Sequence, residues 1–461
     1  MIQPITTPSK VAHRDADPAE IEFQRLKTAA HEELIESLDL STVGEMDHDL
    51  LVAEIRRLSQ ETCEGLGARL SEAAQQRMVR ELQDETFGLG PLEALMRDPT
   101  ISDILVNGPH EVYVERGGRL EPADIVFANE EHLIRIIQRI VSRVGRRIDE
   151  VSSMVDARLP DGSRVNAIIP PLALDGPKLS IRRFGTRPLS AEDLLRGGAA
   201  TPEMLQFLAA AVQARVSFLI SGGTGAGKTT LLNALSGFIP ASERLITIED
   251  SAELILAHRH VVRLETRDAN VEGEGLVTQR DLVRNSLRMR PDRILVGEVR
   301  GAEALDMLQA MNTGHEGSLT TIHANDTRDA LTRLEMMVAM TGLELPIGVV
   351  RQYIGAGIRL VVHLARLQGG SRKIVRISEV VGVKEGDFHL EDLFEYRQLG
   401  VNRQGHACGE FHSTGYRPLC LNRLRASGVT VDEAWFADRV CPAPPPNDEA
   451  SAQGAAANPP G

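Results

Sequence analysis

Aromatic residues are scarce in this chain of 461 residues: only 3% are Phe, Tyr or Trp, with a single Trp and four Tyr. Proteins that bind single-stranded nucleic acids stack bases on aromatic side chains, so this composition argues against a dedicated nucleic-acid-binding protein. The charge argues the same way, because 51 Lys and Arg stand against 65 Asp and Glu, a net charge of −14 with neutral His. Phosphate backbones and anionic lipids repel such a protein, so any contact with them must be local.

Cysteines are also few, and long apolar runs are missing. The four cysteines are Cys63, Cys408, Cys420 and Cys441. They form no C-x-x-C pair and no short disulfide framework, which favours a reducing compartment. Apolar runs such as 216–220 fall far short of the roughly 18 residues that a membrane span needs. The N-terminus lacks the basic start and apolar stretch of a signal peptide. We therefore expect a soluble, cytoplasmic protein that associates with a membrane only through partners.

The apolar pattern divides the chain, which is too long for one ordinary domain, into five parts. The polar or Pro-rich ends, 1–18 and 441–461, are expected to be disordered. Apolar residues at helical spacing predict a small helical domain over 19–86. Short β-like stretches between turn signals predict an α+β domain over 87–187. Over 188–440 apolar strands alternate with helical stretches, which predicts an α/β fold with a mainly parallel sheet.

Charge is distributed unevenly between these parts. Residues 1–50 carry 11 Asp and Glu against 4 Lys and Arg, whereas residues 132–187 carry 11 Lys and Arg against 5 Asp and Glu. A basic segment inside an acidic protein indicates bound anions, although a solvated Arg-rich face would give the same composition.

The clearest motif is a glycine-rich loop. The residues GGTGAGKT at 222–229 match the pattern G-x-x-x-x-G-K-[ST], and they lie between an apolar stretch, VSFLIS, and a helical one, TTLLNALSG. This order of strand, loop and helix is the context that the pattern requires. Glycines let backbone N–H groups approach phosphate oxygens at the positive end of the helix dipole. The expected nucleotide-binding residues are Gly222, Gly223, Thr224, Gly225, Ala226, Gly227, Lys228, Thr229 and Thr230.

The last residues of this motif indicate the ligands, the phosphates of a nucleotide and Mg²⁺. In such loops the lysine, here Lys228, reaches the β- and γ-phosphates. The hydroxyl of the next residue, here Thr229, binds Mg²⁺.

Two apolar strands downstream end in acids. Residues 294–296 precede Glu298, and residues 245–248 precede Glu249 and Asp250. Acids at the carboxyl edge of a parallel sheet point toward a bound metal or its waters. We expect Glu298 to hold Mg²⁺ or its water and Glu249 to activate the attacking water, with the reverse assignment open. Either acid alone could also be a helix cap or a surface residue.

Two histidines flank a third apolar strand. His315 precedes this strand and His323 ends it. A lone histidine is usually structural, but one at the end of a strand beside the phosphate loop could contact the γ-phosphate. We expect His323, together with Arg300, to sense the γ-phosphate, and we include His315 among the candidate nucleotide-binding residues.

These motifs together resemble the secretion and pilus-assembly ATPases of bacteria. The resemblance rests on four ordered boxes, namely Walker A at Gly222–Thr229, an Asp box at Ile246–Leu254, Walker B at Ile294–Gly301 and a His box at Thr313–Asn325. Within that superfamily, four further stretches resemble the CpaF/TadA-type ATPase of the Flp (Tad) pilus system: 157–166, 287–292, 378–380 and 390–394. The resemblance covers about residues 87–437.

The resemblance implies a fold and a function. It implies a RecA-like P-loop NTPase core that follows an α+β N-terminal domain and a small helical extension. It further implies a cytoplasmic, homo-hexameric, Mg²⁺-dependent ATPase at the inner membrane. Through inner-membrane platform proteins, such an ATPase drives pilin polymerisation, with pilin moved indirectly, and the resemblance leaves retraction open.

The resemblance also assigns a role to the basic segment. In the family, arginines of the N-terminal domain close over the phosphates, and the matching positions here are Arg158, Arg164, Arg182 and Arg183. Fixed guanidinium groups of this kind stabilise charge on the transferring phosphoryl group. Some of the four are instead expected to pair with Asp156 or Asp161. The Gly- and Pro-containing linker at 185–189 is the expected hinge.

Three alternatives share parts of this pattern. A type IV secretion ATPase of the VirB kind has the same order of boxes. A RecA-like nucleic-acid motor has the same core, but the net charge and the few aromatics oppose it. A scaffold that binds ATP without hydrolysing it would need the phosphate loop but not the catalytic acids.

Overall fold

The computed structural model describes residues 23, 26–27, 29–30, 48–66, 70–184, 188–267, 269 and 274–442. It divides into two compact units, residues 1–183 and 184–461, each of which is described by itself. The expected disordered segment 1–18 and most of 441–461 lie outside the described residues. Cys441, which the sequence places in the disordered tail, is instead buried in a short strand, because it packs in the core of the second unit.

The first unit begins with two packed helices, α2 (His48–Gly65) and α3 (Glu72–Phe87). Their facing residues include Ile55, Leu58 and Leu82, which form a small core of their own. Ser71 begins α3 by accepting a hydrogen bond from the backbone N–H of Ala74. Helix α3 is joined to the rest of the unit, because its backbone and acids bind side chains of the next two helices, α4 (Leu92–Arg97) and α5 (Glu130–Ser142).

The rest of the first unit is a six-stranded antiparallel sheet in the order β3-β2-β1-β6-β5-β4. Alternate strand residues are buried against α5, whose Leu133, Ile136 and Ile140 are fully covered. The opposite face of the sheet is polar and largely exposed. The strands are β1 (Ile101–Gly108), β2 (Glu111–Arg116), β3 (Arg119–Pro122), β4 (Met154–Arg158), β5 (Arg164–Ile168) and β6 (Lys178–Arg182).

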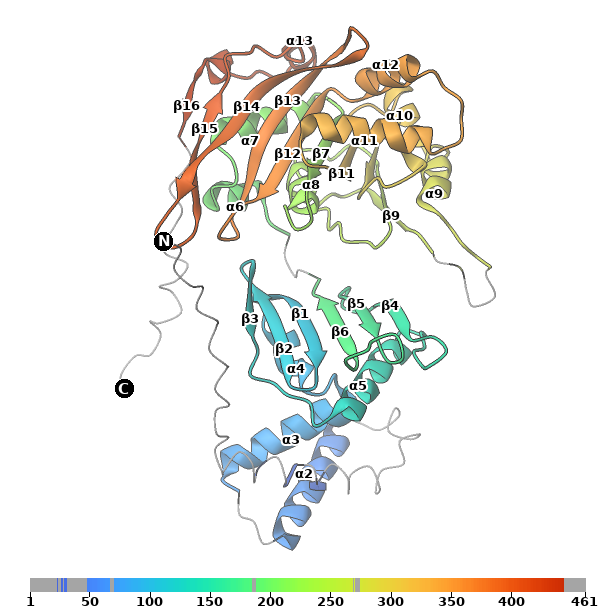
Figure 1. Ribbon diagram of the computed structural model, residues 1–461, viewed down its shortest axis with the longest axis vertical. Helices are drawn as coiled ribbons and strands as arrows, with labels where there is room; N and C mark the ends of the chain where they lie inside the picture. The colour runs from blue at the N-terminus through green and yellow to red at the C-terminus, as the bar shows by residue number, and fades with distance from the viewer. Residues whose placement is uncertain are drawn as a thin grey trace, which may run out of the picture. The chain divides into compact units, whose positions relative to one another are not determined.

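The second unit is built on a ten-stranded sheet in the order β16-β15-β14-β13-β12-β7-β11-β10-β8-β9 (Figure 1). From β12 to β9 every neighbouring pair is parallel. These six strands are β7 (Phe218–Gly222), β8 (Leu245–Glu249), β9 (Val261–Glu265), β10 (Arg293–Val296), β11 (Leu319–His323) and β12 (Leu360–Arg366). This parallel core with its phosphate loop confirms the expected RecA-like α/β fold.

The sheet continues as an antiparallel extension that the sequence analysis did not predict. It consists of β13 (Arg372–Lys384), β14 (Asp387–Val401), β15 (Ala407–Ser413) and β16 (Arg439–Cys441). Short turns join β13, β14 and β15, as is usual for antiparallel neighbours, whereas the connection from β15 to β16 contains the helix α13 (Leu421–Ala426). The extension adds to the edge of the core formed by β12, the strand next to β7.

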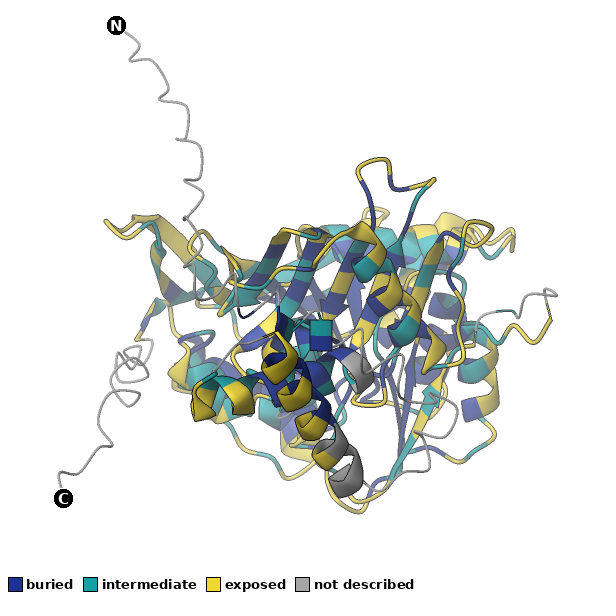
Figure 2. Cartoon of the chain, turned by 90° about the horizontal axis from the view of Figure 1, so that it is seen from below, coloured by how far each residue is buried: buried dark blue, intermediate teal, exposed yellow. Residues whose placement is uncertain are grey.

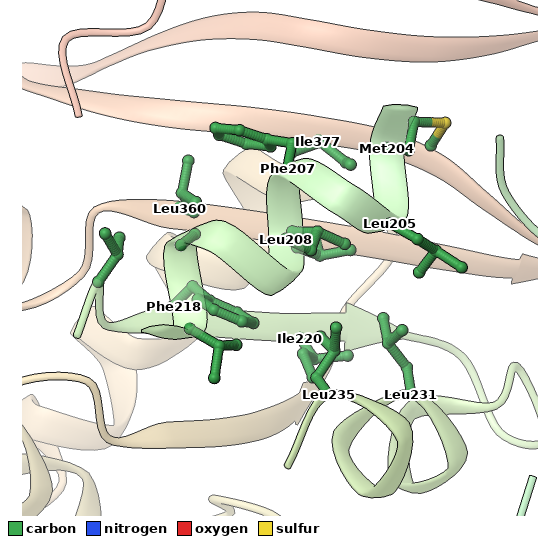
Figure 3. Close-up of a cluster of buried hydrophobic side chains, with 14 of the residues drawn as sticks. Met204, Leu205, Phe207, Leu208, Phe218, Ile220, Leu231, Leu235, Leu360 and Ile377 are labelled. Atoms are coloured by element: carbon green, nitrogen blue, oxygen red, sulfur yellow. The ribbon is translucent and has the colours of Figure 1, made fainter. Parts of the chain in front are cut away.

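Helices cover both faces of the core sheet, and the central strands are buried along their length (Figure 2). One core cluster packs α7 (Pro202–Gln213) and α8 (Lys228–Ser236) on β7; Leu231 and Leu235 lie beside Ile220, and Phe207 lies beside Ile377 (Figure 3). The second cluster packs the helices of the other face on β8, β10 and β11. The helices of this unit are α6 (Ala191–Arg196), α7 (Pro202–Gln213), α8 (Lys228–Ser236), α9 (Gln279–Ser286), α10 (Glu303–Asn312), α11 (Thr327–Ala339), α12 (Ile347–Gly357) and α13 (Leu421–Ala426).

A buried ion pair lies at the amino-terminal edge of the core sheet. Arg293, the first residue of β10, is fully buried, and its guanidinium binds both carboxylate oxygens of Glu243 at 2.6 and 3.1 Å. A third donor of Arg293 binds the carbonyl of Val212 at 2.7 Å. Two parallel hydrogen bonds from one guanidinium fix the geometry of both partners. The pair therefore fixes β10 relative to the end of α7 and the segment before β8. In the described residues no helix is long and apolar enough to cross a bilayer.

Candidate active site

The phosphate loop joins the end of β7 to the start of α8. Gly225 and Gly227 have φ angles of +68° and +100°, which glycine adopts without the steric penalty of a side chain. At Gly222, a Cβ would lie 2.5 Å from the carbonyl oxygen of Leu364 on β12. Any side chain there would push β12 away from β7. These glycines are thus required by the local backbone and by the packing of the neighbouring strand.

Lys228 folds back over this loop as the first residue of α8. Its Nζ donates to the carbonyls of Gly222 at 3.1 Å and Gly223 at 3.2 Å. The same atom lies 3.2 Å from His323 Nε2 and 3.7 Å from Glu298 Oε1. Burial lowers the pKa of Lys228, and the charge of Glu298 opposes that effect. The lysine is only 8% exposed, so it holds its charge through this nearby carboxylate.

His323 ends β11 and lies opposite Gly222 in the parallel pairing of β11 with β7. Its Nε2 is 2.9 Å from Glu298 Oε1 and also within reach of Lys228. Burial and the charge of Lys228 lower the pKa of His323, which favours the neutral ring. In one tautomer of the neutral ring Nε2 accepts from Lys228, and in the other it donates to Glu298, so this one nitrogen cannot serve both neighbours at once. Glu298 Oε1 is buried and has no hydrogen-bond partner among the described residues.

Glu298 lies just beyond β10, and its second oxygen is held by Arg300. The Nε of Arg300 donates to Glu298 Oε2 at 2.8 Å, and its Nη1 lies 3.5 Å from Asp250 Oδ2. Arg300 therefore links the acids that follow β8 and β10. The sequence-predicted Lys228, Glu298, Arg300 and His323 thus form one contiguous cluster.

The donor set of this cluster fits Mg²⁺. The buried, undonated oxygen of Glu298 and the hydroxyl of Thr229 in the first turn of α8 are hard oxygen ligands of the kind that Mg²⁺ prefers. Across the described residues, no three His, Cys, Asp or Glu side chains gather in a group that could hold a metal. The metal would therefore depend on oxygens brought by the phosphates as well as on these two residues.

Glu249, the last residue of β8, has a different environment from the one expected. It is 3% exposed, and its Oε1 accepts the backbone N–H groups of Glu253 and Leu254, each at 2.9 Å. Its Oε2 is buried with no hydrogen-bond partner in the described part of the chain. Burial raises the pKa of Glu249 to about 7, against the effect of the two N–H bonds. Glu249 therefore anchors the loop that follows β8.

That loop carries a functional candidate that the sequence analysis missed. The exposed Glu253 is close enough to raise the pKa of Lys228 and of Arg300 through its charge. The search for acids at strand ends pointed only to Glu249, the last residue of β8, and to Asp250, the residue after it. Glu253 lies four residues after Glu249, whose carboxylate accepts its backbone N–H and so fixes the backbone between them.

His315 is not brought to the phosphate loop, which corrects the expectation from its motif. Strand β11 begins at Leu319 opposite Phe218 and ends at His323 opposite Gly222. His315 precedes this strand, and its backbone N–H binds Ala310 O at the end of α10. It therefore lies at the amino-terminal edge of the sheet, whereas the phosphate loop lies at the carboxyl edge.

Three of the four candidate arginines share one face of the sheet in the first unit. Arg158 pairs with Arg164 across β4 and β5, and Arg164 pairs with Arg182 across β5 and β6. Directly paired residues of antiparallel strands point to the same face, so the three form a row. Arg182 binds Asp103 at 3.1 Å, and Arg164 lies 3.8 Å from Asp156, the acid expected to pair with one of them. We call these three residues the arginine row.

Arg183 does not belong to the arginine row, and its expected role at the nucleotide stays a prediction. It directly follows Arg182 and therefore points away from the row. Its Nη1 donates to the backbone carbonyls of Ile101, at 3.1 Å, and Asp98. These bonds fix the start of β1, which is a structural role.

The strand order, the glycine loop and the acids from two neighbouring strands define a P-loop NTPase with a RecA-like core. More narrowly, the chain belongs to the type II/IV secretion system ATPases, because residues 85–416 match the family described as "Type II/IV secretion system protein". This match confirms the superfamily that the four boxes predicted.

Individual relatives carry names from conjugation and type IV secretion. A putative conjugal transfer protein of Mycobacterium tuberculosis is 43% identical over 308 residues, which are 65% of this chain and 86% of that one. The conjugal transfer protein TrbB of Rhizobium radiobacter is 32% identical over 68% of this chain and 94% of its own. The type IV secretion system protein VirB11 of Brucella suis is 33% identical over 62% of this chain and 87% of its own.

Solved structures also match this chain. The crystal structure of the Brucella suis VirB11 ATPase in complex with sulphate matches with a TM-score of 0.35 and 31% identity, over 64% of this chain and 97% of that one. The pilus retraction motor PilT with bound ADP matches with a TM-score of 0.46 and 19% identity, over 65% of this chain and 82% of that one. The likeness to the Flp (Tad) ATPase remains a prediction.

The buried carboxyl of Glu249 predicts a pH dependence of stability. Its pKa is raised from 4.5 to about 7 by folding, so between these values the folded chain binds the proton more tightly and stability falls as pH rises. Glu249→Gln keeps the acceptor oxygen but cannot ionise. Between about pH 5.5 and about pH 8 the wild type should lose about 2 kcal/mol more unfolding free energy than the variant.

Denaturant unfolding followed by the fluorescence of Trp435, the single tryptophan of the chain, measures this difference in the second unit. Glu410→Gln, at an exposed acid of β15, is the control and should leave the pH profile of the wild type unchanged. Identical pH profiles for wild type and Glu249→Gln would contradict the raised pKa.

Proposed function

We propose that this secretion-family ATPase hydrolyses ATP with Mg²⁺ and uses the energy for movement within a cell-envelope machine. The observation that carries the proposal is the cluster of Lys228, His323 and Glu298 at the mouth of the phosphate loop. A buried lysine charge is stable there only with a nearby negative charge. The triphosphate of ATP supplies several such charges directly opposite the loop.

Each side chain of the cluster has a defined task in this proposal. Lys228 leaves the loop carbonyls for the β- and γ-phosphates, while Thr229 and Glu298 hold Mg²⁺. The metal supplies neutralisation of phosphate charge. His323 and Arg300 contact the γ-phosphate side and lose that contact when it is released. Loss of the contact would free His323 at the end of β11 and Arg300 after β10 to move.

The water-activating role moves from Glu249 to Glu253 in this proposal. Glu249 is buried, and its carboxylate is committed to two backbone N–H groups. Glu253 is exposed, and its charge raises the pKa of both Lys228 and Arg300, so we propose that it serves the water that approaches a bound γ-phosphate. Glu249 then acts by holding Glu253 in place.

The arginine row is proposed to complete the site during hydrolysis. Its three guanidinium groups lie on one polar face, which suits binding of a polyanion. We propose that the chain works as a homo-hexameric ring in which these arginines close over the phosphates, and that the linker at 185–189, of which 185–187 lie outside the described residues, is the hinge for this closure.

The machine served is proposed to be a Flp (Tad) pilus assembly system. In that setting the ATPase works on the cytoplasmic side of the inner membrane, binds platform proteins and moves pilin indirectly in pilus assembly, with retraction left open. The names of the relatives favour a second candidate, a type IV secretion ATPase of the VirB kind. Nucleic acid is not the proposed substrate, because the net charge of −14 opposes it.

A glutamine series tests the chemistry. Glu253→Gln should bind ATP but lower kcat by about 10²- to 10³-fold, the size expected for loss of a general base. Glu298→Gln should weaken Mg²⁺-dependent activity to a similar extent, whereas Glu249→Gln should lower kcat less than about tenfold. Steady-state phosphate release at saturating MgATP measures these values, with Lys228→Ala as the inactive reference. Near wild-type turnover by Glu253→Gln would refute its assignment.

The arginine row predicts a separation of activity from stability. Arg164→Ala should lower kcat by about 10³-fold, as for an arginine that contacts the transferring group, and leave unfolding unchanged. Arg183→Ala should instead destabilise the first unit, because it removes the bonds to the start of β1. Phosphate release and urea unfolding by circular dichroism measure the two effects. Unchanged kcat in Arg164→Ala would remove the arginine row from the site.

A cellular experiment distinguishes the two machines. A chromosomal Lys228→Ala change should abolish surface pili and leave conjugal DNA transfer and type IV effector secretion at wild-type levels. Electron microscopy of the cell surface counts the pili, and mating assays count the cells that have received DNA. Normal piliation with lost transfer or secretion would instead identify the VirB kind of function.

A further inference from the structure

Two arginines outside the known motifs lie against the phosphate loop. Arg366 ends β12, Arg372 begins β13, and the two are paired directly across this hairpin. The Nε of Arg372 donates to the carbonyl of Gly225 at 2.8 Å. A Cβ on Gly225 would lie 3.5 Å from Arg366 Nη1, and one on Gly227 would lie 3.5 Å from Arg372 Cδ. Both side chains therefore flank the outer side of the loop.

The contact with Gly225 acts on the part of the loop that is hardest to order. A phosphate-binding loop turns its N–H groups inward and its carbonyls outward, and glycines there lose much conformational freedom on ordering. Lys228 covers the carbonyls of Gly222 and Gly223 from one side. Arg372 covers the carbonyl of Gly225 with a charged donor, which gives a stronger hydrogen bond than a neutral one.

The hairpin is a rigid support for this contact. Directly after Arg372, the Nζ of Lys373 donates to Gly198 O at 2.5 Å, and the backbone N–H of Ile374 donates to Ala199 O at 2.8 Å. Three consecutive residues at the start of β13 are thus fixed, one to the phosphate loop and two to the segment after α6. Side chains on such anchored elements hold their partners more exactly than side chains on loops.

We propose that Arg372 is a positioning residue for nucleotide binding, which holds the phosphate loop in the shape that accepts the β-phosphate, and that Arg366 beside it adds positive charge to the same site. This inference rests on the proposed ATPase function, since it concerns the same loop. Arg372 acts on a loop carbonyl and not on the γ-phosphate. It therefore favours ATP and ADP equally and contributes nothing specific to the transition state.

Titration calorimetry of the full-length protein with MgATP and MgADP tests the inference. Arg372→Met keeps the length of the side chain but loses the donor and the charge. It should raise Kd about tenfold for both nucleotides, the effect of one charge-assisted hydrogen bond. At saturating ATP its kcat should stay within about twofold of wild type, so that KM changes and kcat does not.

Two further variants complete the experiment. Arg366→Met should raise both Kd values about threefold, and raised salt should reduce that difference because the charge is exposed. Arg397→Met, at an exposed arginine of β14 paired with Glu395, is the matched control and should bind as wild type does. Unfolding without nucleotide, followed by Trp435 fluorescence, should be the same for Arg372→Met and wild type.

The results that would overturn the inference are distinct from those that would overturn the ATPase proposal. Wild-type Kd values in Arg372→Met would refute the positioning role. A loss of stability without nucleotide that accounts for the whole loss of affinity would also refute it, since the contact would then be merely structural. A larger effect on ATP than on ADP would mean that Arg372 acts at the γ-phosphate instead. A wild-type protein that binds neither nucleotide would overturn both proposals.

Discussion

The parallel pairing of β7 with β11, which sets His323 opposite Gly222, is the constraint on which the nucleotide site depends. Because the strands are parallel, the chain returns to the same edge of the sheet after each helix, and every strand end is a new place for a functional side chain. The neighbouring strands β10 and β8 lead to Glu298 and Glu249 at that edge. The helices on both faces and the buried Arg293 at the far edge keep this register in place.

Electrostatics then gives the edge its chemical character. Lys228 is buried, Glu298 carries a buried oxygen without a hydrogen-bond partner in the described structure, and His323 lies within 3.2 Å of both residues. Such a set of groups is poorly satisfied by itself, because burial penalises each charge and one histidine nitrogen can serve only one neighbour. A polyphosphate with its metal satisfies all three groups. Because these three groups are incompletely paired without a ligand, they favour tight binding of a nucleotide and respond to the loss of its γ-phosphate.

Much of this site was predictable from local sequence, and the exceptions have identifiable physical reasons. The phosphate loop was predictable because its residues are contiguous, and Glu298 and His323 were predictable because strand ends of a parallel sheet converge. Glu253 was missed because its position depends on how Glu249 folds the loop after β8. His315 was misassigned because a motif gives spacing along the chain and not the edge of the sheet.

Long-range pairing explains the remaining differences. Arg372 contacts Gly225 from 147 residues away, so no local pattern could indicate it. The antiparallel extension from β13 to β16 has its own register, which depends on neighbours far along the chain. Arg182 and Arg183 look alike in sequence, and only the strand bounds of β6 show that they point to opposite faces.

The close approach of Gly222 to Leu364 has a consequence for how this architecture can be divided or recombined. The phosphate loop packs against a strand that the ribosome makes about 140 residues later. During synthesis the loop lacks this neighbour until β12 emerges, and a transplanted module that ends before β12 would carry the motif without it. A portable unit must therefore include at least the span from β7 through β13, together with α7, which packs on β7.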